Sequence, residues 1–178
     1  MQGKGWAYGS EFLIRKTKGK TTGWVSYTLS WSKRQFDEIN NGKEFYARND
    51  RRNDISVVVN QKIKKRISAS LSWVYYTGSA VSFPTGIMEV GGTTVPIYSE
   101  RNADRMAAYH RMDASVTLAG KEGKKFQSSW NFAIYNLYAR KNPYAYQFRE
   151  SKTDPGKQEV KMLYLFGIVP SISYNLKF

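Results

Sequence analysis

Apolar and polar residues alternate with a period of two along most of this chain. Successive side chains of a strand point to opposite faces, so each alternating segment predicts a strand with one apolar and one polar face. No stretch shows the three-to-four spacing of an amphipathic helix, which predicts an all-β chain. The seven expected strands are residues 5–17, 22–33, 52–61, 66–76, 110–119, 126–138 and 170–178.

The connections between these strands alternate in length. Short turns are expected at residues 18–20, 62–65 and 120–123, and long loops at 34–51, 77–109 and 139–167. Outer-membrane barrels have short periplasmic turns and long extracellular loops. With this parity the last strand runs inward and ends in the periplasm. The pattern therefore predicts antiparallel transmembrane β-barrel strands.

The last strand places one apolar row beside a polar row. Its apolar residues are Ile172, Tyr174, Leu176 and Phe178. Bacterial outer-membrane barrels end on a strand of this kind, which their assembly machinery recognises. We therefore expect these four residues to form an outer-membrane assembly signal, with the barrel assembly machinery as a partner.

The polar faces of the strands are rich in Ser, Asn and Thr, which suits a barrel lumen. Trp and Tyr occur near strand ends, as in the aromatic girdles of membrane interfaces. The alternative is that these aromatics pack the core of a soluble sandwich. Within the last long loop, residues 144–149 and 159–166 flank Asp154-Pro155-Gly156. A Pro-Gly pair favours a turn, so an extracellular hairpin extension is expected there.

Composition narrows the class of protein. Aromatics make up 15% and apolar residues 41% of the 178 residues, too much for a disordered chain. The chain has no cysteine, which excludes disulfides and thiolate metal sites. Residues 1–6 lack the apolar core of a signal peptide. An exported chain is therefore expected to have lost its leader or to be part of a longer protein.

The net charge of +14 is concentrated at the turns. The basic residues there are Lys16, Lys18, Lys20, Lys62, Lys64, Lys65, Arg66, Lys121, Lys124 and Lys125. Such runs suit a solvated surface or contact with anionic lipid headgroups. Nucleic acid is the third interpretation, but no binding motif accompanies the charge, so no nucleic-acid partner is expected.

Catalytic chemistry is not expected. The single histidine, His110, lies three positions from Asp113, which places the two side chains on opposite faces of a strand and prevents a dyad. Ligands for a metal site are lacking. We therefore predict no enzyme activity, no catalytic or metal-binding residue and no cofactor.

Several segments, taken together and in order, resemble the C-terminal barrel of a TonB-dependent outer-membrane receptor of the Bacteroidetes type. They are Ala7-Tyr8-Gly9-Ser10-Glu11, Gly23-Trp24-Val25-Ser26-Tyr27-Thr28-Leu29-Ser30, Asp50-Arg51-Arg52-Asn53-Asp54, Tyr109-His110-Arg111-Met112-Asp113, Asn136-Leu137-Tyr138, Asn142-Pro143-Tyr144 and residues 170–178. The family often has His in the place of Asn53.

The resemblance implies an importer of scarce nutrients, built as a twenty-two-stranded barrel around a plug and driven by TonB. Residues 1–178 would supply its last seven strands, without the plug domain, and would not transport alone. Seven strands cannot enclose a plugged lumen, so we expect a fragment or a barrel completed by another polypeptide. The implied partners are outer-membrane lipid, the rest of the barrel and plug, and TonB through that plug. A surface lipoprotein stays open as a further partner.

The long loops hold the candidate ligand contacts, because loops carry recognition on a rigid scaffold. These candidates are Phe36, Phe45, Tyr46, Phe83 and Tyr98, although packing among the loops also accounts for them. Arg51, Arg52 and Asp54 are expected to form an ion-pair cluster at the loop base. Two other hypotheses stay open: a self-contained small outer-membrane barrel, structural or enzymatic, and a soluble basic β-domain that binds polyanions.

Overall fold

The computed structural model describes residues 2–98, 100–121, 126–151 and 158–177, and it is all-β with antiparallel sheets. Seven long strands make up the large sheet. They are β1 (Gly3–Lys16), β2 (Thr21–Phe36), β4 (Asn53–Lys64), β5 (Ile67–Tyr76), β10 (Tyr109–Ala119), β11 (Gln127–Tyr135) and β14 (Val169–Lys177). The shorter elements are η1 (Asn40–Gly42), β3 (Phe45–Tyr46), β6 (Ala80–Val81), β7 (Gly86–Val90), β8 (Thr93–Ile97), β9 (Asp104–Arg105), β12 (Ala145–Glu150) and β13 (Gln158–Leu163).

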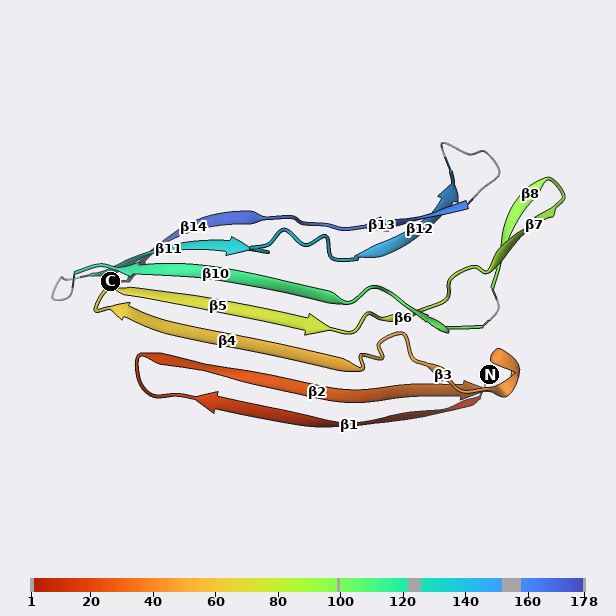
Figure 1. Cartoon of the computed structure of the whole chain (residues 1–178), viewed down its shortest axis with the longest axis horizontal. Helices are drawn as coiled ribbons and strands as arrows, with labels where there is room; N and C mark the ends of the chain where they lie inside the picture. Colours follow the sequence, from red (N-terminus) through yellow and green to blue (C-terminus); the bar gives the residue numbers. More distant parts are fainter. Residues whose placement is uncertain (1, 99, 122–125, 152–157, 178) are drawn as a thin grey trace. The chain divides into compact units, whose positions relative to one another are not determined.

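The long strands follow the chain in the order β1-β2-β4-β5-β10-β11-β14, and β3 adds to β2. Figure 1 shows them in this order, from red β1 to blue β14. The seven predicted strands and their antiparallel arrangement are thus confirmed. Within the described residues β1 and β14 are the two edges and do not pair with each other.

The chain divides into two compact units. The first, here called the loop unit, comprises Met1–Phe12, Tyr27–Asp54 and Tyr76–Ala108. The second, the turn unit, comprises Leu13–Ser26, Ile55–Tyr75 and Tyr109–Phe178. The loop unit holds two of the long connections, and the turn unit holds all three short turns.

In the turn unit, the register of β10, β11 and β14 places apolar residues beside apolar ones and polar residues beside polar ones. One row across the three strands is Val116, Phe132 and Ile172, and the next row is Leu118, Trp130 and Tyr174. On the opposite face Thr117, Asn131 and Ser173 form a polar row. The alternation in sequence therefore becomes one apolar and one polar face, as predicted.

The apolar rows are not covered by other parts of their unit. Ile172 is 66% exposed, Trp130 48% and Phe132 42%. In the part of the chain that the structure describes, the buried side chains are those of Phe45, Ala47, Asp50, Ala80 and Asn136. None of these five lies in the seven long strands. The sheet thus builds no core of its own.

Three details differ from the sequence-based expectation. The loop 77–109 contains the hairpin β7–β8 and the pair β6–β9, and the loop 34–51 contains η1 and β3. Strand β11 ends at Tyr135 instead of residue 138 because Asn136 adopts a left-handed φ of 56°, which a strand cannot continue through.

The hairpin predicted in the last connection is confirmed, since β12 pairs antiparallel with β13 from Ala145–Leu163 to Glu150–Gln158. The turn Asp154-Pro155-Gly156 and the terminal Phe178 lie outside the described residues. The other three residues of the expected assembly signal lie on β14, where Ile172, Tyr174 and Leu176 are all exposed.

Candidate functional site

A buried carboxylate holds the loop unit together. The Asp50 side chain is fully buried, and its Oδ1 accepts a hydrogen bond of 2.6 Å from the Ser32 amide of β2. Its Oδ2 forms an ion pair with Arg105 of β9 and lies 3.8 Å from Nη2 of Arg52. A buried charge is tolerated when it is paired and hydrogen-bonded. Asp50 therefore links the connection 34–51 to β2 and to the connection 77–108.

The same two arginines lie against an aromatic ring. The guanidinium carbons of Arg105 and Arg52 lie 4.8 Å and 5.3 Å from the ring centroid of Tyr46. Arg105 also donates from Nη1 to the carbonyl oxygens of Asp50 and Gly78, at 3.0 Å and 3.2 Å. Cation–π contacts add to the ion pairs, so Tyr46 is a structural part of this cluster.

Two asparagines join one loop to the next. Asn40 of η1 accepts from the Arg101 amide at 2.7 Å and donates to the Arg101 carbonyl at 3.2 Å. Asn102 donates from its amide to Ser82 Oγ and from Nδ2 to the Tyr46 carbonyl, both at 2.8 Å. Both asparagines have a left-handed φ, 52° for Asn40 and 55° for Asn102, which Asn adopts more readily than most residues. These bonds fix the shape of the loop surface.

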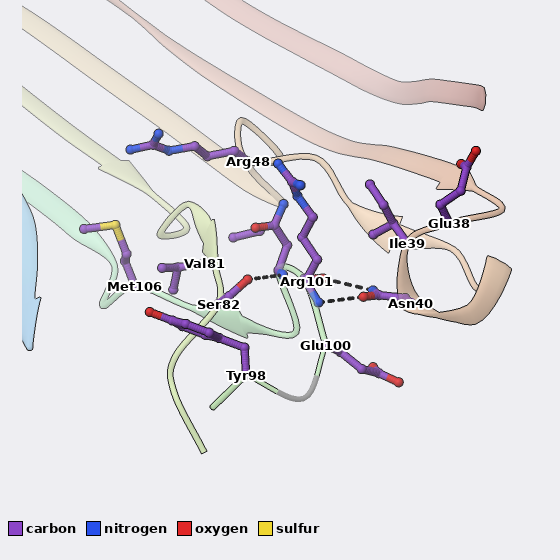
Figure 2. A pocket seen from close by; sticks show the side chains of 12 residues that line it. Glu38, Ile39, Asn40, Arg48, Val81, Ser82, Tyr98, Glu100, Arg101 and Met106 are labelled. Carbon is purple, nitrogen blue, oxygen red and sulfur yellow. Dashed lines mark hydrogen bonds between the residues drawn. The ribbon is translucent and has the colours of Figure 1, made fainter. Parts of the chain in front are cut away.

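A hollow of about 660 Å³ lies between these joined loops. Figure 2 shows Tyr98, Val81 and Met106 on one side of it, and Glu38, Ile39 and Asn40 on the other. Arg48, Glu100 and Arg101 complete its charged lining. This volume falls in the range of small-molecule sites. Both signs of charge beside an aromatic ring and aliphatic side chains suit a ligand with polar and apolar parts.

The five sequence-predicted contact residues lie in three places. Tyr98 lines the large hollow and is half exposed. Phe45 and Tyr46 line a second hollow of about 260 Å³, and Phe36 lies 6.2 Å from Phe45 between ring centroids. Phe83 lies outside both linings, and its amide donates to Asp104 at 3.3 Å. Because Phe45 is buried, Tyr98 is the candidate best placed to meet a ligand.

The lining residues Glu38, Arg48 and Arg101 were not among the sequence-based candidates. Only Glu38 had a local signal, the nearby Asn40-Asn41-Gly42, whose residue types favour turns. No spacing in the sequence pairs Asn40 with Arg101, which lies sixty-one positions away.

The predicted ion pair at the loop base is partly as expected. Arg51 lies 3.5 Å from Asp54, and its guanidinium carbon lies 3.9 Å from the ring centroid of Tyr76. Arg52 instead turns to Asp50 and to the ring of Trp31, 4.6 Å away. The cluster therefore has an exposed pair and a buried one.

In the turn unit, His110 and Asp113 take different partners. His110 Nδ1 lies 2.8 Å from the Tyr138 hydroxyl. Asp113 accepts two bonds from Arg111 Nε, at 2.9 Å and 3.0 Å, and a third from the Asn136 amide at 2.9 Å. Both side chains therefore stabilise the loop end of β10.

No protein-family model, no curated protein and no solved structure matches this chain. Among the described residues, no helix is both long and apolar enough to cross a membrane. The described part of the chain also holds no group of three or more metal-ligating side chains.

Proposed function

We propose that this chain forms part of the wall of a transmembrane β-barrel in the bacterial outer membrane. One observation carries the proposal: β10, β11 and β14 align exposed apolar rows on one face and polar rows on the other. Soluble proteins rarely expose large contiguous apolar surfaces. A barrel wall has lipid on one face and a polar lumen on the other, which accounts for the exposed apolar rows and for the polar rows.

We further propose that the barrel is that of a TonB-dependent nutrient importer. The resemblance of the segments around Tyr8, Arg52 and His110 supports this, as does the alternation of short turns and long connections. The loop unit adds a hollow with a fixed polar lining, of the kind that could receive a nutrient. Alone, the chain would not transport.

The free edges of the sheet support a larger barrel. β1 and β14 each leave one side of their backbone unpaired within the described residues, and lipid does not tolerate unpaired backbone groups. We infer that further strands, from the rest of a receptor or from another polypeptide, pair with these edges.

The membrane proposal is tested with neighbouring residues on opposite faces of β14. The chain has no cysteine, so Ile172→Cys and Ser173→Cys each give a unique site for a spin label. After refolding into phospholipid vesicles, we expect the label at residue 172 to collide with oxygen and the label at residue 173 with a water-soluble nickel complex. Equal access of the nickel complex to both labels, or a monodisperse monomer without detergent, would contradict the proposal.

The proposal of a larger barrel is tested at the edges. A short crosslinker between Phe12→Cys on β1 and Ile172→Cys on β14 should not join them within one chain in vesicles. Efficient intrachain crosslinking would instead favour the self-contained small barrel. Reading the gene upstream of the Met1 codon gives a second test, since the proposal expects coding sequence for a plug and further strands in the same frame or in a separate gene.

A further inference from the structure

The two ends of the long strands differ in charge. Residues 15–20, 62–66 and 121–125, where the sequence predicts the short turns and their flanks, hold eleven Lys and Arg residues and a single acidic one, Glu122. The three long connections, by contrast, hold ten of the fourteen acidic residues. The net positive charge of the chain is thus concentrated at the strand ends that the short turns join.

The structure joins these turns into one edge of the turn unit. The Lys62 amide donates to the Lys20 carbonyl at 2.8 Å, which links the first turn to the second. The Ala119 amide donates to the Arg66 carbonyl, and Arg66 Nε returns a bond to the Ala119 carbonyl, both at 2.8 Å. The described cations here form what we call the basic edge: Arg15, Lys16, Lys18, Lys20, Lys62, Lys64, Lys65, Arg66 and Lys121.

Apart from Nε of Arg66, which donates to the Ala119 carbonyl, the charged groups of the basic edge are available to a partner. All of them are exposed. Among residues 2–121, 126–151 and 158–177, leaving out residue 99, no carboxylate lies within 4.0 Å of any of these cations. A cluster of like charges without counter-ions attracts anions to its surface.

Exposed apolar side chains lie immediately beside these cations. Ile14 is 77% exposed one position before Arg15, and Ile63 is 54% exposed between Lys62 and Lys64. Leu118, near the end of β10, and Leu176, near the end of β14, are exposed too. Lysine and arginine extend from apolar surface toward charged headgroups at a membrane interface. A nucleic acid would need the cations but not the aliphatic residues.

We propose that the basic edge binds the phosphate groups of anionic phospholipids in the leaflet that the short turns face. The inference rests on the proposed membrane location and adds a lipid class and a surface to it. Each cation near an anionic membrane strengthens binding by about fivefold. The basic edge would therefore also fix the depth and direction of the strands in the bilayer.

The test compares vesicles of phosphatidylcholine alone with vesicles that also contain phosphatidylglycerol. The full chain, refolded from urea, should bind the anionic vesicles at least about tenfold more tightly at low salt. The preference should fall with added salt, because exposed charges are screened. The triple variant Lys16→Gln, Lys18→Gln and Lys20→Gln should lose most of it.

A matched variant removes the same charge elsewhere. Lys4→Gln, Arg34→Gln and Lys161→Gln alter exposed cations outside the basic edge. This variant should keep the preference for phosphatidylglycerol. Circular dichroism of both triple variants should show the strand content of the unmodified chain, so that a change in binding is not a change in folding.

The outcomes separate this inference from the proposed function. Equal, salt-independent binding to both vesicle types overturns the lipid inference and leaves the membrane proposal standing. Failure to bind phosphatidylcholine vesicles overturns the membrane proposal. Tighter binding to duplex DNA than to anionic vesicles, unchanged by Leu118→Ser and Leu176→Ser, overturns the lipid inference in favour of a polyanion partner.

Discussion

The loop unit is built around a buried carboxylate, and the turn unit around a sheet with an exposed apolar face. The loop unit buries the Asp50 carboxylate and pairs it with two arginines. The turn unit leaves Trp130, Phe132 and Ile172 exposed along one face of a sheet. The loop unit thus pairs its buried carboxylate internally, whereas the apolar rows of the turn unit are left to their surroundings.

This difference shows that the fold has two sources of stability. Ion pairs and hydrogen bonds among the loops act wherever the chain is placed, although salt weakens their exposed members. Exposed apolar rows stabilise the sheet only where something apolar covers them. The shape of the loops should therefore depend little on the membrane, and the stability of the sheet should depend on it strongly.

The largest expected effect is that of a charge in the middle of the apolar rows. Phe132 lies between Val116 and Ile172 in its row. If that face meets lipid, Phe132→Lys should lower the free energy of unfolding in phospholipid vesicles by about 4 kcal/mol. A urea titration followed by tryptophan fluorescence measures this. Ser173→Lys, on the polar face of the adjacent strand, is the control and should have a small effect; equal losses would remove the asymmetry between the faces.

The second effect should be confined to the loop unit. Asp50→Ala leaves Arg105 and Arg52 without their carboxylate, which should cost about 3 kcal/mol, near the lower end for breaking a buried pair because both arginines are partly exposed. Hydrogen exchange at the Ser32 amide measures this loss of stability, because that amide loses its acceptor.

The exposed ion pair of the same region provides the control. Arg51 and Asp54 are 3.5 Å apart, and both side chains are more than a third exposed. Asp54→Ala should therefore lower the free energy of opening, measured by hydrogen exchange, by less than about 1 kcal/mol. If Asp50→Ala speeds exchange in β11 as much as at Ser32, the two units do not have separate sources of stability.

The sheet was predictable from the sequence because its determinants are local. Alternation with a period of two gives each strand and its faces without knowledge of the partner strand. The hairpin β7–β8 was missed although it had a signal, Gly91-Gly92 between two extended segments, with φ values of 58° and 76°. The end of β11 at Tyr135 depends on one left-handed residue, Asn136, which the alternation does not reveal.

The loop unit was predictable only where its partners are close in sequence. Arg51 and Asp54 are three positions apart, and their pairing was expected. Asp50 meets Arg105 across fifty-five positions, and no local pattern links them. The same reason explains why Tyr98 was found as an exposed aromatic, while the charged residues around it were not.

Asn136 gives the turn unit a buried polar group to compare with Asp50 of the loop unit. It is the one buried residue described in the turn unit. Its Nδ2 donates to the carbonyls of Arg140 at 3.0 Å and Gly167 at 3.3 Å. Asn136→Gly keeps the left-handed backbone and should lose about 1 kcal/mol of stability with these bonds. Asn136→Ala adds backbone strain and should lose about 2 kcal/mol. Urea unfolding in detergent micelles measures both; equal losses would mean that the backbone conformation contributes nothing.

The smallest effect concerns the polar face of the sheet. Asn131 Nδ2 donates to Thr117 Oγ1 across β11 and β10 at 2.8 Å. In a face that meets water, cross-strand polar pairs contribute little, so a double-mutant cycle of Asn131→Ala and Thr117→Val should give a coupling of about 0.5 kcal/mol. If lipid covers only the other face, moving the chain from micelles to vesicles should leave this coupling unchanged. A coupling well above 1 kcal/mol would instead indicate a dry face, packed against something other than water.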